Sequence, residues 1–331
     1  MNISTESNLT ALLLSEAFSG VAVVRHNGET LVKFAGGLAD RDTGRPNTLV
    51  TRFATASVGK MFTATCLARL EDAGLCQLSQ PLADVVPSLA AHFDKRMSLA
   101  SLLSHRSGLG DYINDDSDLP FAGMDVARLD RPGAFLPYVL KAPQGAPREF
   151  SYSSAGFILL GLAIEELTGM SYPEAMDHWV LEPAGLRSTG FPPMDDPPTD
   201  FANGYLPDGR TNAGHLPRIG GPDGGIVTTA ADLQSFFGCL RSGDFLSQSA
   251  RSFLWQEQGR INAISDYGHG FYLTPICGGM WPGHTGSDPG VSARVAFSPH
   301  SNSSIIVLCN RDEVAFDVFR LAMEHLNALA S

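Results

Sequence analysis

Residues 57–64 read Ser57-Val58-Gly59-Lys60-Met61-Phe62-Thr63-Ala64, with a serine and a lysine three positions apart in an apolar segment. In a helix this spacing places both side chains on the same face, within reach of each other. A serine hydroxyl is a weak nucleophile until a neighbouring base takes its proton, and lysine can do so when burial depresses its pKa. The N–H groups at the start of the helix can also stabilise developing negative charge. The stretch therefore predicts that Lys60 activates Ser57 as a nucleophile.

The same spacing has a simpler interpretation. Ser57 can be an ordinary helix cap and Lys60 a surface residue, because Ser-x-x-Lys arises readily by chance. Two observations favour the catalytic interpretation. The chain has only four lysines, at positions 33, 60, 95 and 141, so a lysine inside an apolar helix is unusual. The pair also has apolar neighbours, namely Ala54, Ala56, Val58, Met61 and Phe62.

A second segment of interest reads Phe150-Ser151-Tyr152-Ser153-Ser154 and precedes an apolar helical stretch. A tyrosine at the entry to a buried helix can direct its hydroxyl into a cleft, where nearby positive charge lowers its pKa enough for proton transfer. The residue also fits a core tyrosine whose hydroxyl has a hydrogen-bond partner. Tyr152 is therefore a candidate for proton transfer that the local sequence alone does not decide.

A third segment reads Trp281-Pro282-Gly283-His284-Thr285-Gly286-Ser287 and lies between two expected strands. Small residues in such a position let a sheet edge approach a ligand closely. The N–H of Ser287 is then available to complete an oxyanion hole. Taken alone, the segment fits a turn.

The composition limits the classes of partner and the location. The 331 residues are 44% hydrophobic with a formal net charge of −12, which repels polyanions, so nucleic acid is not an expected partner. The five cysteines include no Cys-x-x-Cys pair, and their odd number leaves one unpaired, which favours a reducing compartment. The apolar stretch at 11–14 is too short for a signal peptide, and no segment approaches the length of a membrane span. We therefore expect a cytoplasmic protein that does not contact membranes.

The two ends of the chain favour strands, whereas its middle favours helices. β-Branched runs at 20–25 and 30–34 flank an Asn-Gly turn and predict a β-hairpin. Three more strands are expected at 267–274, 291–297 and 304–308. Helices are expected at 58–73, 98–104, 132–141, 154–167, 172–180, 230–240 and 314–330.

These elements predict an α+β fold. We expect an antiparallel sheet built from N- and C-terminal strands, flanked by helices, with an inserted, mostly helical lobe. The chain would form a single catalytic domain of two lobes. The first would take in residues of about 1–75 and 225–331, and the helical lobe residues of about 76–224. A site between the lobes would follow naturally.

In order and spacing, Ser57-x-x-Lys60, Tyr152-x-Ser154 and His284-Thr285-Gly286 resemble the three motifs of the serine β-lactamase and penicillin-binding-protein superfamily. The chain is most similar to the class C β-lactamase-related branch, which also includes esterases, D-aminopeptidases and acyltransferases. Supporting stretches lie at 102–109, 152–169 and 224–233, so the resemblance covers most of residues 18–312. This resemblance implies the same fold, a sheet flanked by helices with a helical lobe.

The resemblance also implies a mechanism. Ser57 would form an acyl-enzyme, Lys60 and Tyr152 would share proton transfer, and the N–H groups of Ser57 and Ser287 would hold the oxyanion. Which of Lys60 and Tyr152 is the general base stays open, because two coupled groups titrate as a pair. No metal and no cofactor is implied.

Two departures from the family pattern bear on the substrate. β-Lactamases of this branch usually end the second motif with asparagine, where this chain has Ser154, and begin the third with lysine, where it has His284. The asparagine helps to hold the substrate's amide. The lysine is a permanent cation suited to a β-lactam or peptide carboxylate, whereas histidine is mostly neutral at pH 7. The His-x-Gly form is similar to that of D-aminopeptidases and several esterases.

The first hypothesis is thus an esterase or a D-aminopeptidase-like amidase acting on a small ester or amide. A β-lactamase or D-Ala-D-Ala carboxypeptidase is the alternative, and an acyltransferase is a third possibility. A non-catalytic penicillin-binding-like sensor belongs to a different class, and the full motif set speaks against it. The residues expected to bind oxyanion or substrate are Ser287, His284, Thr285, Gly286, Ser154, Tyr112 and Tyr205.

Other polar residues have simpler interpretations. His105 and Arg106 are expected to hold their loop by hydrogen bonds. The pairs Asp115-Asp116 and Asp195-Asp196 fit solvated turns, because no histidine is spaced to join them as a metal ligand.

Overall fold

Strands from both ends of the chain join in one sheet. The computed structural model describes residues 3–113, 119–312 and 314–330. The strands are β1 Gly20–His26, β2 Glu29–Gly36, β7 Gly259–Arg260, β8 Asp266–Tyr267, β9 Tyr272–Ile276, β10 Gly279–Asp288, β11 Val291–Phe297 and β12 Ser304–Cys309. They form an eight-stranded antiparallel sheet in the order β2-β1-β12-β11-β10-β9-β8-β7. The expected α+β class is therefore confirmed.

The predicted hairpin of β1 and β2 forms one edge of this sheet. Asn27 and Gly28 separate the two strands, and their φ values of 49° and 90° are the positive pair that a two-residue type I′ turn requires. On its other side β1 pairs with β12, so that Val23 lies opposite Ile306. This pairing brings the first and last strands of the chain together.

Helices and two short strand pairs complete the fold. The helices are α1 Ile3–Leu13, α2 Lys60–Asp72, α3 Leu82–Val85, α4 Leu99–Leu103, α5 Pro132–Val139, α6 Ser154–Thr168, α7 Tyr172–Met176, α8 Ala230–Arg241, α9 Gln248–Leu254 and α10 Val314–Ala330. The short pairs are β3 Leu38–Asp40 with β4 Arg45–Pro46, and β5 Phe53–Ala54 with β6 Val227–Thr228.

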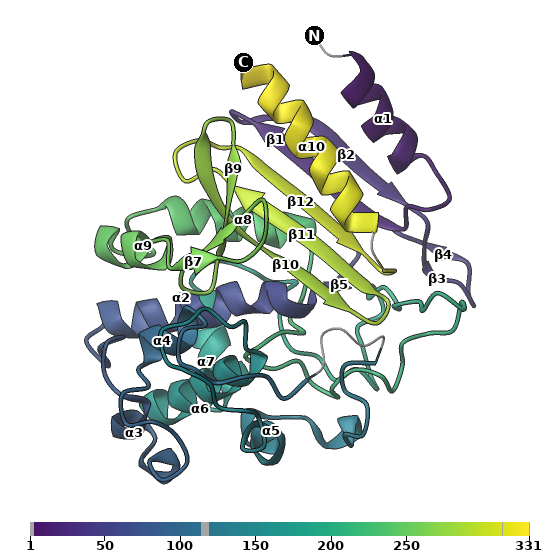
Figure 1. Cartoon of the computed structure of the whole chain (residues 1–331). Helices are drawn as coiled ribbons and strands as arrows, with labels where there is room; N and C mark the ends of the chain where they lie inside the picture. Colours follow the sequence, from purple (N-terminus) through teal and green to yellow (C-terminus); the bar gives the residue numbers. More distant parts are fainter. Residues whose placement is uncertain (1–2, 114–118, 313, 331) are drawn as a thin grey trace.

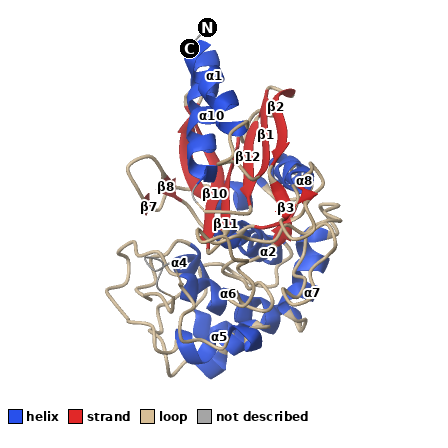
Figure 2. Cartoon of the chain, turned by 90° about the vertical axis from the view of Figure 1, so that its right-hand side faces the viewer, coloured by secondary structure: helices blue, strands red, loops and turns tan. Residues whose placement is uncertain are grey.

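The sheet has helices on both faces (Figures 1 and 2). Because alternate residues of a strand face opposite sides, Ala22 of β1 packs with α1 and α10, whereas Val21 packs into the larger core that contains α2. In Figure 1 helices α3 to α7 lie together below the sheet, and α2 runs between them and the strands. The larger core is continuous from the sheet through α2 into α6. The lobe boundaries expected near residues 75 and 225 stay a prediction.

The segment at residues 281–287, which contains His284, forms a strand and not the turn that its sequence suggested. It lies within β10, which pairs with β9 on one side and β11 on the other. Gly283 makes this pairing possible, because a Cβ there would lie 2.0 Å from the carbonyl O of Val295. A segment rich in glycine and proline therefore forms a central strand through close backbone approach, which propensity does not reveal.

Smaller differences concern element boundaries. The strand expected at 267–274 is divided into β8 and β9 by a turn in which Gly270 has φ of 81°. Ser57 lies in a 3-10 helix, Ala56–Gly59, and the α-helix begins only at Lys60. Helices α1, α3 and α9 were not expected from the sequence.

No single helix in the described parts of the chain is long and apolar enough to cross a membrane. Helix α6 reaches that criterion only together with the following Tyr172–Leu181 segment, from which it is bent by 75°. Most residues of α6 are buried in the larger core. The expected cytoplasmic location stays a prediction.

Candidate active site

Ser57 lies in a tight turn that the sheet holds from one side. Ala56, directly before it, has φ of 47°, a left-handed conformation that residues other than glycine rarely adopt. Strand β10 passes this turn at Gly286, where a Cβ would lie 2.0 Å from the carbonyl O of Thr55. The absence of a side chain at Gly286 therefore sets how closely the third motif approaches Ser57.

Lys60 is fully buried, and the partners of its amine include two hydroxyls and a main-chain carbonyl. Its Nζ lies 2.9 Å from Oγ of Ser57, 3.2 Å from Oγ of Ser154 and 2.6 Å from the carbonyl O of Asp223. The short distance to Ser57 is within the range needed for direct proton transfer.

Tyr152 packs against the same lysine. Its ring centroid lies 4.9 Å from Nζ of Lys60, which is cation–π distance. Helix α6 begins two residues later, and the carboxylate of Asp111 accepts the N–H of Ser154 at 2.6 Å. This cap fixes the helix start that presents Ser154 to Lys60. The structure thus brings together the serine, the lysine and the ring of the tyrosine; their catalytic roles stay predictions.

His105 holds the loop that carries Tyr152. Its carbonyl O accepts the N–H of Ser151 at 2.8 Å, and its Nδ1 accepts the N–H of Ser153 at 3.1 Å. Burial, together with the positive charge of Lys60, lowers the pKa of His105 well below 6.5. His105 was expected to hold its own loop by hydrogen bonds; the bonds described here join it instead to the segment that carries Tyr152.

His284 is buried, and both of its ring nitrogens have partners. Nδ1 lies 2.6 Å from the carbonyl O of Thr285, which can only accept, so Nδ1 carries the proton. Nε2, 3.1 Å from the hydroxyl of Tyr267, therefore accepts from it. Burial and the charge of Lys60 lower the pKa of His284 to about 3. At neutral pH the third motif consequently offers no cation to a substrate carboxylate.

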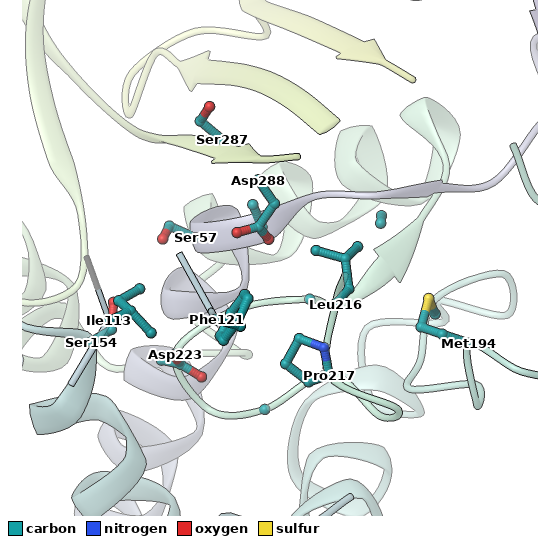
Figure 3. A pocket seen from close by; sticks show the side chains of 16 residues that line it. Ser57, Ile113, Phe121, Ser154, Met194, Leu216, Pro217, Asp223, Ser287 and Asp288 are labelled. Atoms are coloured by element: carbon teal, nitrogen blue, oxygen red, sulfur yellow. The ribbon is translucent and has the colours of Figure 1, made fainter. Parts of the chain in front are cut away.

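A pocket opens beside Ser57 (Figure 3). In the view of Figure 3 Ser57 lies between Ser287 and Asp223, and Phe121, Leu216 and Pro217 lie to one side of it. The lining residues are Ala54, Ala56, Ser57, Ile113, Phe121, Ser154, Met194, Leu216, Pro217, Gly220, Gly221, Asp223, Gly224, Gly225, Ser287 and Asp288. The lining is mostly apolar, and its ionisable side chains are carboxyl groups.

Asp223 is a site residue that the sequence did not suggest. It lies in the glycine-rich loop at 220–225 and is 8% exposed. The hydroxyl of Tyr112 donates to its Oδ2 at 2.8 Å, so Tyr112 supports a pocket carboxylate without being part of the lining itself. Burial raises the pKa of Asp223 to about 6, and Lys60 opposes that rise. In the sequence, a single aspartate among glycines indicates only a loop and not a functional residue.

Other expected site residues lie elsewhere. Tyr205 is not among the pocket-lining residues; its hydroxyl accepts the N–H of Arg41 at 2.6 Å, and its ring lies under the Arg41 guanidinium. Thr285 is half-buried opposite Arg294 in the sheet and also does not line the pocket. Tyr205 lies there because main-chain hydrogen bonds join its loop to β3 and to the residue after β12: Asn203 N–H donates to the carbonyl O of Ala39, and Tyr205 N–H donates to that of Asn310.

The remaining polar candidates are structural. Arg106 donates to the carbonyl O of Gln258 and so ties its loop to the sheet side. Asp195 forms a 3.0 Å ion pair with Arg218 at the surface. Asp115 and Asp116 lie outside the described residues. Among the residues that the structure describes, no group of three or more histidine, cysteine or acidic side chains could hold a metal ion.

Comparisons with known proteins identify the family of the chain. A family model described as Beta-lactamase matches residues 6–330. The crystal structure of a penicillin-binding protein from Bacillus halodurans superposes with a TM-score of 0.88 at 32% identity, covering 96% of this chain and 99% of that one. Esterase EstB of Burkholderia gladioli is 32% identical over 195 residues, which are 56% of this chain and 49% of the esterase. A D-aminopeptidase of Brucella anthropi is 27% identical over 332 residues, covering 92% of this chain and 59% of that protein. With a match that spans nearly its whole length, the chain belongs to the Beta-lactamase family.

Proposed function

We propose that this chain is a serine hydrolase that forms an acyl-enzyme on Ser57 and acts on small ester or amide substrates, as an esterase or a D-aminopeptidase-like amidase. The observation that carries the proposal is the 2.9 Å contact between Oγ of Ser57 and Nζ of the buried Lys60, at the wall of an apolar pocket. A hydroxyl in contact with a buried amine is the arrangement that nucleophilic catalysis needs.

The proposed reaction has two halves. Oγ of Ser57 attacks the carbonyl carbon while its proton passes to the pair formed by Lys60 and Tyr152, which accepts it with either Lys60 as the neutral amine or Tyr152 as the phenolate. The N–H groups of Ser57 and Ser287 hold the oxyanion, and the proton then passes to the leaving alcohol or amine as the carbon–heteroatom bond breaks. Water attacks the acyl-enzyme in the second half and restores the Ser57 hydroxyl.

The charges of the site support a substrate without a carboxylate. His284 is neutral and both of its ring nitrogens are occupied, whereas the pocket wall contains the carboxyl groups of Asp223 and Asp288. A substrate carboxylate would therefore meet like charge without a compensating cation from the third motif. Neutral esters and amides avoid this repulsion.

A β-lactamase or D-Ala-D-Ala carboxypeptidase is the second candidate, because the solved structure with 32% identity is named as a penicillin-binding protein. Transfer of the acyl group to an alcohol or amine is compatible with the same first half-reaction.

A substrate panel tests the proposal. p-Nitrophenyl esters, a D-alanine anilide and a chromogenic cephalosporin are assayed side by side, with Ser57→Ala as the blank. We expect ester or anilide turnover to exceed cephalosporin turnover and to disappear in the Ser57→Ala variant. Faster cephalosporin turnover would support the second candidate instead.

A further inference from the structure

His105 occupies a conformation that is unfavourable for its residue type. It follows helix α4 with φ of 56°, a left-handed value that costs a residue with a side chain roughly 1–2 kcal/mol. Glycine usually takes this position after a helix, because it adopts such φ values without strain. A histidine there indicates that its side chain contributes something that glycine would not.

A second unfavourable feature lies in the ring. Nδ1 accepts a hydrogen bond from the main-chain N–H of Ser153, so the proton of the neutral ring sits on Nε2. Nε2 is buried and has no hydrogen-bond partner among the described residues. An unsatisfied buried donor costs about 1–3 kcal/mol. Strain and an unpaired donor in one residue are features that concentrate at functional sites.

Three contacts of His105 converge on Tyr152 and its neighbours. Its carbonyl O and its Nδ1 bind the N–H groups of Ser151 and Ser153, the two residues that flank the tyrosine. The ring centroids of His105 and Tyr152 are 4.2 Å apart. His105 therefore holds the main chain on both sides of Tyr152, through its carbonyl O and its Nδ1, and its imidazole packs against the tyrosine ring.

The far side of the imidazole is also supported. The ring of Tyr267 lies 4.7 Å from that of His105, centroid to centroid, and the ring of Phe157 lies 5.3 Å away. With aromatic rings on several sides, the imidazole has little freedom to move away from Tyr152. Tyr267 in turn donates to His284, so the second and third motifs meet through this aromatic layer.

We propose that His105 is a positioning residue that holds Tyr152 in the orientation needed to share proton transfer with Lys60. The inference rests on the proposed function, because it assigns a task to a residue beside the reacting groups. His105 acts through Tyr152 and does not touch the substrate; it is not among the pocket-lining residues.

A double-mutant cycle tests this dependence. His105→Gly removes the ring and relieves the strained φ. We expect it to lower kcat for a p-nitrophenyl ester about 10- to 100-fold, the scale of a small misplacement in an active site, with KM changed by less than about threefold. In a Tyr152→Phe background the same change should have almost no further effect, because the hydroxyl that His105 positions is already gone.

Two more variants sharpen the test. His105→Asn tolerates the left-handed φ and supplies a side-chain oxygen that can replace Nδ1 as acceptor of the N–H of Ser153. It should therefore recover part of the kcat lost in His105→Gly, and it keeps the test available if the glycine variant does not fold. His269→Asn is the control. His269 is another buried histidine, with Nδ1 2.8 Å from the carbonyl O of Phe253, and its replacement should lower Tm without lowering kcat selectively.

Different results count against the role of His105 and against the serine hydrolase activity itself. Two results would overturn the role of His105 alone. One is that His105→Gly lowers kcat by the same factor in the Tyr152→Phe background as in the unaltered chain. The other is a folded His105→Gly variant whose kcat is unchanged. A lack of turnover of every ester and amide by the unaltered chain would overturn the proposed function as well.

Discussion

Nζ of Lys60 lies 2.9 Å from Oγ of Ser57, although Lys60 is wholly shielded from solvent. We expect Lys60→Met to lower kcat for p-nitrophenyl acetate by about 10²–10⁴-fold, the usual contribution of a general base. Lys95→Met, which changes an exposed lysine, is the matched control and should leave kcat unchanged. Steady-state kinetics on folded protein measures both. A Lys60→Met variant with more than about a tenth of the original kcat would argue against proton transfer through this lysine.

Gly286 should tolerate no side chain. Gly286→Ala places a Cβ 2.0 Å from the carbonyl O of Thr55, so β10 must move away from the turn that carries Ser57. We expect a loss of about 1–3 kcal/mol in the free energy of unfolding, together with a fall in kcat. Gly279→Ala in the same strand is the control, because its Cβ would have its nearest neighbour at 4.0 Å. Equal stability of the two variants would contradict this assignment.

Asp223 should make the enzyme discriminate against anionic acyl groups. We compare a neutral p-nitrophenyl ester with a matched ester whose acyl chain ends in a carboxylate. Asp223→Asn removes a pocket charge but keeps an oxygen that can accept from Tyr112. We expect the ratio of kcat/KM for the neutral ester to kcat/KM for the anionic ester to fall about fivefold, which corresponds to roughly 1 kcal/mol of repulsion. Asp208→Asn, an exposed residue paired with Arg210, is the control and should not change the ratio.

The same ratio should depend on pH. Because burial raises the pKa of Asp223 to about 6, its carboxylate is mostly charged at pH 7.5 and mostly neutral at pH 5. Discrimination by the unaltered chain should therefore weaken as the pH falls through about 6, and the Asp223→Asn variant should lack that change. A ratio that is independent of pH in both proteins would contradict the role of Asp223.

Buried neutral histidines should make the fold sensitive to acid. Burial lowers the pKa of His284 from 6.5 to about 3 and that of His269 to about 4, and it lowers the pKa of His105 as well. Below pH 6.5 the unfolded chain therefore binds protons that the folded chain does not, and stability falls with pH. Each group contributes up to about 1.4 kcal/mol per pH unit. Asp223, whose pKa is raised from 3.8 to about 6, opposes this fall between those two values.

Urea unfolding at pH 7.5, 6 and 5 measures this dependence. The free energy of unfolding should drop steadily across the series, and the drop should be shallower in His269→Asn, which lacks one of the depressed groups. Constant stability from pH 7.5 to 5 would show that these histidines are not held neutral by the fold.

The sequence predicted the parts of the site that depend on local spacing. Ser57 and Lys60 are three positions apart at the start of a helix, so their contact follows from helical geometry. The hairpin at Asn27-Gly28 was predictable for the same kind of reason. Tyr152 became a strong candidate only through the order of the three motifs, because its position beside Lys60 depends on how α6 packs against α2.

Features that depend on tertiary packing were not predictable in this way. Asp223 reaches the pocket only because the glycine-rich loop folds under Lys60. His284 was expected to bind oxyanion or substrate, but its partners Tyr267 and Thr285 keep both ring nitrogens occupied. Strand β10 escaped notice because its glycines give a turn-like composition, whereas their function is to permit close backbone approach.

Intact-mass analysis after reaction with a fluorophosphonate tests whether Ser57 is the nucleophile. We predict one covalent adduct per chain, located on Ser57 by peptide mapping, and neither adduct nor ester turnover in Ser57→Ala. An unmodified chain, an adduct on another residue, or ester turnover that persists in Ser57→Ala would contradict it.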